Sequence, residues 1–301
     1  MVMKKVGMWG ALAYLFVFAA IAYSAIKLAG GENHLLSANP LLLSFAVLAY
    51  LLSILFWAFA WASSGNIPFV EAAGLTFASA SGAVTPLGAG SDALRGYFSG
   101  RSDIALADIV SSSLATKLQK LALTGLVSLA FLGVFFPELD PLVVTASSLG
   151  IALGFLGILA VWIASGKSGK ILSFIPRRFI PEGLAHGSER FRDLLAKPSL
   201  AAVAFLFVST FFEFASFVLC FLAFGADIGL PASFGAFTVI FFAAKLPFLH
   251  GFGLIELVGA VLLNSLLPVP QLVAILFAFD FCRLWFPTLL SLLFIAGKFG
   301  R

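Results

Sequence analysis

The chain has 301 residues, of which 61% are hydrophobic and 11% are charged, with a mean hydropathy of +1.09 and a formal net charge of +4. Soluble domains carry about 25% charged residues, so this composition excludes a soluble enzyme, a disordered chain and a nucleic-acid-binding module. Because the apolar runs are of helical length and lipid admits only helices or closed barrels, the sequence predicts an all-α, polytopic membrane protein. No metal ion or cofactor is expected, and no residue is predicted to be catalytic.

Six apolar runs are taken as full membrane spans, since a straight helical crossing needs roughly 20 residues. In chain order they are Val6–Leu28, Leu41–Ala62, Leu121–Phe136, Leu142–Ala164, Ala201–Phe224 and Gln271–Ile295. The third run is short, so its helix is expected to begin near Leu114. Cys220 and Cys282 lie inside the last two runs, where we expect them to be small buried core residues.

Two further stretches, Phe69–Leu114 and Phe234–Leu267, are apolar at both ends but interrupted at the centre by proline, glycine and charge. Their flanking pieces are about half as long as a full crossing, which favours two re-entrant helical hairpins over pairs of short tilted spans. The helices that restart after the turns are expected to attract phosphate at their N-termini. The predicted turn residues are Pro86, Gly88 and Gly90 in the first stretch and Pro247, Gly251 and Gly253 in the second.

The two interrupted stretches align with one another at a single offset. The matched pairs are Pro86 with Pro247, Gly90 with Gly251 and Arg95 with Glu256. Three full crossings separate the stretches, so they run in opposite directions, which is the pattern of an inverted-topology repeat. Chance is the alternative, because helix breaks in any apolar chain contain proline and glycine. We treat 1–301 as a single membrane domain with halves at about 41–164 and 201–301, joined by loop 165–200.

The basic residues cluster before the first run, in loop 165–200 and at the C-terminal end. With six full crossings and two hairpins all three clusters fall on one side of the membrane, and basic segments remain in the cytoplasm. We therefore predict a multi-pass protein of the plasma membrane with both termini in the cytoplasm. Loop 165–200 is expected to lie on a surface of anionic lipid headgroups.

Nine polar side chains in or beside apolar segments are predicted to line a hydrophilic cavity for a charged substrate group. Each charge costs roughly 2.5–3.5 kcal/mol at the bilayer centre, so these groups must pair or face water. The alternative is structural pairing between helices, and Asp280 and Arg283, at i and i+3, could simply pair with each other. Glu213 is expected to balance a nearby lysine. The predicted binding residues are Arg95, Lys117, Lys120, Glu213, Lys245, His250, Glu256, Asp280 and Arg283.

Three sequence motifs resemble those of the lysylphosphatidylglycerol synthase transmembrane-region family, which is also called flippase-like. Thr85–Gly90 together with Asp92–Tyr97 resembles the first signature. Pro247 followed by Gly251-Phe252-Gly253 and Glu256 resembles the second, and Asp280–Arg283 resembles the helix that follows. The resemblance extends from about Leu41 onward. His250 stands where a glycine is usual and Ile255 where a basic residue often precedes the glutamate, which leaves the lipid headgroup open.

The resemblance implies movement of a phospholipid or a polyprenyl-phosphate-linked lipid between leaflets, with the membrane lipid as substrate. It also implies a glycosyltransferase or lipid-modifying enzyme as a partner, whereas synthesis of the lysyl lipid is not expected of 1–301. Two alternatives remain open at this point. One is a membrane-embedded transferase or hydrolase acting on such lipids, and the other is a non-transporting scaffold for a glycosyltransferase.

Overall fold

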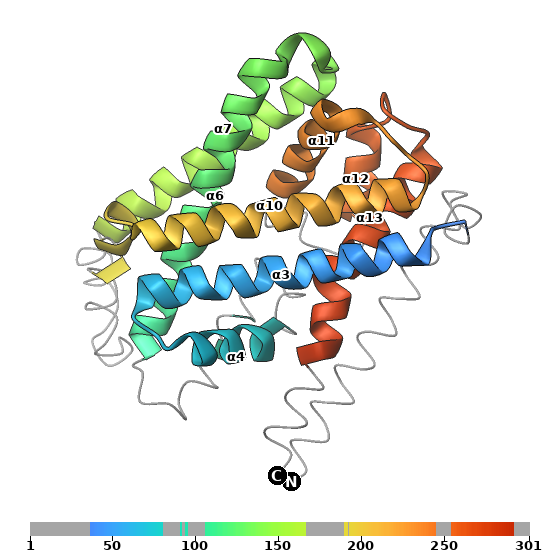
Figure 1. Cartoon of the computed structure of the whole chain (residues 1–301). Helices are drawn as coiled ribbons and strands as arrows, with labels where there is room; N and C mark the ends of the chain where they lie inside the picture. Colours follow the sequence, from blue (N-terminus) through green and yellow to red (C-terminus); the bar gives the residue numbers. More distant parts are fainter. Residues whose placement is uncertain are drawn as a thin grey trace.

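The computed structural model describes residues 37–80, 91, 94, 95, 106–166, 190, 191, 193–244 and 254–291. This part of the chain is helical and contains no strand (Figure 1), which confirms the predicted all-α polytopic fold. The elements are α3 (Pro40–Gly65), α4 (Phe69–Ser79), α6 (Leu106–Phe135), η3 (Phe136–Glu138), α7 (Pro141–Gly166), α10 (Leu200–Ala223), α11 (Gly229–Ala243), α12 (Leu254–Leu262), α13 (Val269–Asp280) and the π-helical η5 (Phe281–Trp285).

Among the described residues, five helices are long and apolar enough to cross a membrane. They correspond to five of the six predicted spans, and the remaining one, Val6–Leu28, lies outside the described residues. The third span was expected to begin near Leu114, and the candidate span begins at Ser111, within a helix α6 that itself starts at Leu106. Lys117 and Lys120 do not interrupt this helix, since both face an internal cavity.

Three short helices flank the two predicted breaks. Helix α4, with 11 residues, precedes the first break, while α11, with 15 residues, and α12, with 9 residues, lie on either side of the second. The second interrupted stretch was predicted to start at Phe234, but α11 already begins at Gly229. The turns themselves lie outside the described residues, so the choice between hairpins and short spans stays a prediction.

Helices α3 and α10 lie antiparallel and side by side (Figure 1). The Asn39 backbone N–H donates to the Ala223 carbonyl at 2.7 Å and thereby joins the start of α3 to the end of α10. The Asn39 side chain also accepts from the Leu41 N–H at 3.0 Å, capping the first turn of α3. Asn66, in the left-handed conformation at φ 53°, ends α3.

A cluster of phenylalanines joins α10, α11 and α13. The Phe217 ring centroid lies 5.8 Å from that of Phe237 and 5.1 Å from that of Phe279, and both pairs meet edge to face. Aromatic pairs in this geometry add about 0.5–1.5 kcal/mol beyond the area that they bury. Cys220 and Cys282 are free thiols buried in the same cluster, as predicted.

The end of α11 is fixed by a close approach to α7. A Cβ atom placed on Gly150 would lie 2.8 Å from the Cβ of Phe242, and one placed on Gly154 would lie 2.6 Å from Cε1 of the Phe242 ring. Both distances are shorter than any ordinary contact. The two glycines therefore form a socket for Phe242, which a side chain at either position would fill. The residue next to Phe242 in the chain, Phe241, lines the cavity described below.

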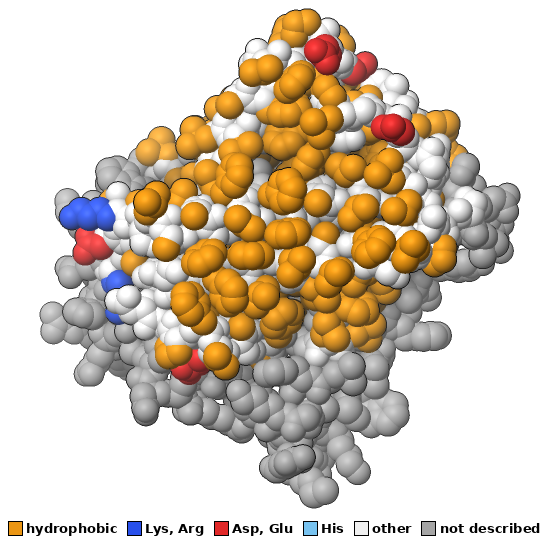
Figure 2. Space-filling view, viewed as in Figure 1, with side chains coloured by type: hydrophobic (Ala, Val, Ile, Leu, Met, Phe, Trp, Pro, Cys, Tyr) orange, Lys and Arg blue, Asp and Glu red, His pale blue; other side chains and the backbone are white. Residues whose placement is uncertain are grey.

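Charged and apolar side chains are separated on the molecular surface. Figure 2 shows hydrophobic side chains across the middle of one face and charged groups toward its ends. Lys197 precedes α10 and Asp227 follows it, and the 24 residues of this helix span about 36 Å. Glu138 and Asp140 lie in the α6–α7 connection, which packs against α11 close to the Asp227 end. One end is therefore basic or mixed, the other is acidic, and the middle fits hydrocarbon.

Candidate functional site

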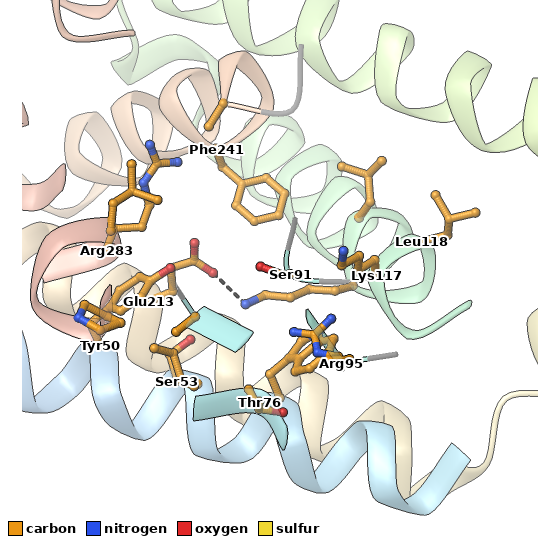
Figure 3. Close-up of a pocket in the computed structure, with 18 of the residues that line it drawn as sticks. Tyr50, Ser53, Thr76, Ser91, Arg95, Lys117, Leu118, Glu213, Phe241 and Arg283 are labelled. Carbon is orange, nitrogen blue, oxygen red and sulfur yellow. Dashed lines mark ion pairs between the residues drawn. The ribbon is translucent and has the colours of Figure 1, made fainter. Parts of the chain in front are cut away.

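A cavity of about 390 Å³ lies among α3, α4, α6, α10, α11 and the α13–η5 helix (Figure 3). Its charged lining consists of four cations and one carboxylate among the described residues: Arg95, Lys117, Lys120, Arg283 and Glu213. These side chains come from segments far apart in the sequence, and the fold brings them to one space. Because each was singled out as an expensive intramembrane charge, the cavity is the candidate site.

Lys120 forms a close ion pair across the cavity wall. Its Nζ lies 2.6 Å from Oε2 of Glu213, and the side chains are 14% and 7% exposed. The Lys120 ammonium also donates to Ser209 Oγ at 3.0 Å, and the Ser209 hydroxyl donates in turn to the Ser53 carbonyl at 2.9 Å. The lysine of α6 is therefore held by α10 and α3 together, and the expected pairing of Glu213 with a nearby lysine is confirmed.

Arg95 is held by aromatic and hydroxyl groups. Its guanidinium carbon lies 4.6 Å from the ring centroid of Trp57 and 5.3 Å from that of Trp61, within the range of cation–π attraction. Its Nη1 donates to Ser113 Oγ at 2.8 Å. Trp61 is itself oriented by its indole N–H, which donates to Ser112 Oγ at 2.8 Å. Arg95 is only 5% exposed, so this arrangement fixes a guanidinium on the cavity wall.

Arg283 reaches the cavity from the π-helical turn η5. Its Nε donates to Asp280 Oδ1 at 2.9 Å, and its Nη2 lies 2.6 Å from the same oxygen. The structure thus contains the i, i+3 pair that the sequence allowed. Single π-helical turns inside α-helices are rare and occur frequently at functional sites. Here the turn carries the cavity's Arg283 and begins directly after Asp280.

Glu256 and Asp280 are not among the residues that line the cavity. Glu256 is 4% exposed in the first turn of α12, and its electrostatic neighbours are Asp280 and Arg283. Arg95 instead packs on the tryptophans of α3. The two residues paired by the repeat alignment therefore have different neighbours: Arg283 and Asp280 for Glu256, and the tryptophans of α3 for Arg95.

The remaining predicted site residues fall outside the described part of the chain. They are Lys245 and His250, together with the turn residues Pro86, Gly88, Gly90, Pro247, Gly251 and Gly253.

Sequence reasoning missed the neutral residues that position the cations. Trp57 and Trp61 are four residues apart on one face of α3, and this spacing within an apolar run was the available signal. Ser53, on the same helix face, and Ser209 and Ser113 gave no comparable signal. Serine is common in membrane helices, so only the contacts with Lys120 and Arg95 distinguish them.

The lining is suited to a phosphate or another anionic group. Guanidinium groups match phosphate oxygens in a bidentate geometry, and ammonium groups bind them as point charges. Leu114 lines the same cavity and is 37% exposed, so an apolar side chain lies beside the cations. The described residues contain no group of three or more histidine, cysteine, aspartate or glutamate side chains that could hold a metal ion.

Comparison with family models assigns most of the chain to one family. The family model described as the lysylphosphatidylglycerol synthase TM region matches residues 8–291. No curated protein matches the chain.

Proposed function

We propose that this chain, which belongs to the lysylphosphatidylglycerol synthase transmembrane-region family over residues 8–291, moves a phosphate-bearing lipid between the leaflets of the membrane. The family indicates a function related to membrane lipids. The proposal adds that the cavity holds the lipid headgroup during passage. Its substrate would be a phospholipid or a polyprenyl-phosphate-linked lipid.

The single observation that carries the proposal is the excess of cations on the cavity wall. Four basic side chains and one carboxylate line the space among the described residues. Each such charge is costly inside a bilayer, and polar groups kept there mark substrate or ion pathways. A phosphate group would add negative charge among these cations, which supports an anionic headgroup.

The surroundings of the cavity suit an amphiphile. A translocated lipid must keep its headgroup in a polar site while its chains stay in hydrocarbon. Leu114 lines the cavity and is 37% exposed, which would give the acyl chains an apolar contact beside the headgroup. A volume of about 390 Å³ lies within the range of small-molecule sites and exceeds what a bare phosphate needs.

The proposed orientation places the basic end in the cytoplasm of a plasma-membrane protein. Lys197 lies at that end, and Arg190 donates to the Gly65 carbonyl at the end of α3 at 3.1 Å. Cytoplasmic loops carry an excess of lysine and arginine, and such residues attract anionic lipid. We extend the proposal to an anionic lipid surface as the contact of loop 165–200, with both termini on the same side.

The proposal is tested with purified protein in phosphatidylcholine liposomes that carry fluorescent phosphatidylglycerol. A membrane-impermeant reductant reports how fast inner-leaflet lipid reaches the outer leaflet. The double variant Lys120→Gln with Glu213→Gln removes one charge of each sign, so no uncompensated buried charge remains to unfold the protein. Lys197→Gln, at an exposed position, is the control.

We expect the wild type and Lys197→Gln to accelerate lipid movement equally and the double variant to slow it at least tenfold. Translocation by the folded double variant at the wild-type rate would contradict the proposal, as would a wild type no faster than empty liposomes. Lipid extracted afterwards should be chemically unchanged. A modified headgroup would favour the transferase or hydrolase alternative.

A further inference from the structure

The ion pair between Lys120 and Glu213 lies on the wall of the cavity rather than behind it. Both residues line the cavity, with Lys120 on α6 and Glu213 on α10. Their charged atoms are 2.6 Å apart (Figure 3, dashed line). The Glu213 carboxylate therefore occupies the Lys120 ammonium, which an anionic headgroup would otherwise contact. Glu213 and the headgroup would compete for the same cation.

A phosphate cannot bind Lys120 while Glu213 stays in place. The lysine ammonium has three donors, of which Ser209 receives one at 3.0 Å and Glu213 is in contact with another. A phosphate on the remaining donor would lie a few ångströms from the Glu213 carboxylate. Like charges at that distance repel, and the low exposure of Lys120 and Glu213, 14% and 7%, strengthens the repulsion. Binding of an anion to Lys120 therefore requires the carboxylate to turn away.

Arg283 offers the displaced carboxylate a second partner. Figure 3 shows Glu213 between Arg283 and the ammonium group with which it pairs, and the charges of Glu213 and Arg283 interact. Asp280 contacts the Nε and Nη2 atoms of Arg283. Because a guanidinium has five N–H donors, it can hold a second carboxylate beside Asp280.

We propose that Glu213 is a displaceable counter-ion that holds Lys120 while the cavity is empty, yields it to the phosphate of an entering lipid by turning to Arg283, and returns as the lipid leaves. This inference rests on the proposed function and assigns Glu213 a positioning role within it. The exchange keeps Lys120 compensated in the empty cavity, where a lone buried charge would be costly. It also limits affinity, since a site that transports its ligand must release it.

Glu213→Gln tests the exchange because it keeps the shape of the side chain and removes its charge. The probe is inorganic phosphate added to the purified full chain, with binding followed by calorimetry and by the thermal unfolding midpoint. We expect Glu213→Gln to bind phosphate at least tenfold more tightly than the wild type and to show a larger phosphate-dependent rise in the midpoint. In liposomes the same variant should move fluorescent phosphatidylglycerol more slowly, because release becomes limiting.

Two further variants separate competition from a purely structural pair. Ser209→Ala removes a hydrogen bond to Lys120 without changing any charge, so it should not tighten phosphate binding. Glu213→Asp restores the negative charge and should return the affinity toward that of the wild type. If Glu213→Gln unfolds without phosphate but is recovered by it, the exchange is supported, since phosphate then replaces the missing carboxylate.

The inference would be overturned if the Glu213→Gln variant bound phosphate no more tightly than the wild type. It would also be overturned if this variant unfolded and added phosphate did not restore its folding. Failure of the proposed function looks different. An inactive wild type in liposomes, combined with tighter phosphate binding by Glu213→Gln, would refute lipid translocation and leave the exchange at an anion site intact. An active wild type with unchanged Glu213→Gln binding would refute the exchange alone.

Discussion

Replacement of Gly154 by alanine tests whether the socket on α7 positions the end of α11. The new Cβ would lie 2.6 Å from Cε1 of Phe242 and 3.0 Å from its Cδ1, so the ring must move. Phe242 directly follows Phe241, which lines the cavity. The substitution should therefore disturb both the packing of α11 and the cavity wall. Gly157, on the same helix, has no atom within 4 Å of the position of an added Cβ, which makes Gly157→Ala the matched control.

The expected size of the effect follows from two opposing terms. Alanine is better than glycine in a helix by about 0.8–1.0 kcal/mol, and both variants share this gain. Overpacking a well-filled contact costs about 1–3 kcal/mol, and only Gly154→Ala incurs it. The free energies of unfolding of the two variants should therefore differ by about 1–3 kcal/mol, with Gly157→Ala the more stable.

The assay is thermal unfolding of the purified variants in one detergent, followed by lipid translocation in liposomes. Gly157→Ala should unfold at or above the wild-type midpoint, and Gly154→Ala below that of Gly157→Ala. The double variant Gly154→Ala with Phe242→Ala removes the ring and should lose less stability than the sum of its parts. Equal midpoints for the two alanine variants would refute the socket.

Three other substitutions have directions set by contacts in the structure. Asn39→Ala removes the side-chain cap of α3 and should lower the free energy of unfolding by about 0.5–2 kcal/mol, measured by chemical denaturation. Asp280→Asn leaves the charge of Arg283 without its 2.6 Å partner and should cost about 3–5 kcal/mol, read as a lowered unfolding midpoint that Asp280→Glu partly restores. Trp57→Leu removes the nearer ring from Arg95 and should weaken phosphate binding to the purified chain by roughly 0.5–2 kcal/mol, whereas an unchanged affinity would show that the ring does not position this cation.

The spans and the gathering of charges could be predicted because both follow from the cost of placing groups in hydrocarbon. That cost identified α3, α7 and α10 within a few residues of their observed ends. It also singled out Lys120 and Glu213, which meet at 2.6 Å although they are far apart in the sequence. Helix α6 begins earlier than the apolar run at Leu121, because Lys117 and Lys120 face the cavity and the helix continues through them.

Other features depend on packing that no sequence pattern specifies. The spacing of Trp57 and Trp61 marks one face of α3, but it does not specify that Arg95, from another segment, packs on these rings. The π-helical turn Phe281–Trp285 has no compositional signature, because it arises when one extra residue is accommodated within a helix fixed at both ends. The socket for Phe242 likewise exists only because glycines of α7 face α11.

The central claim, that the cavity holds a lipid phosphate, is tested most directly by an experimental structure of the protein in nanodiscs of phosphatidylglycerol. The measurement is the distance between Lys120 Nζ and the nearest lipid phosphorus atom. We predict a phosphate in contact with Lys120 inside the cavity, with the Glu213 carboxylate moved toward Arg283. Lipid phosphates found only at the two ends of α10, with Lys120 still paired to Glu213, would contradict the claim.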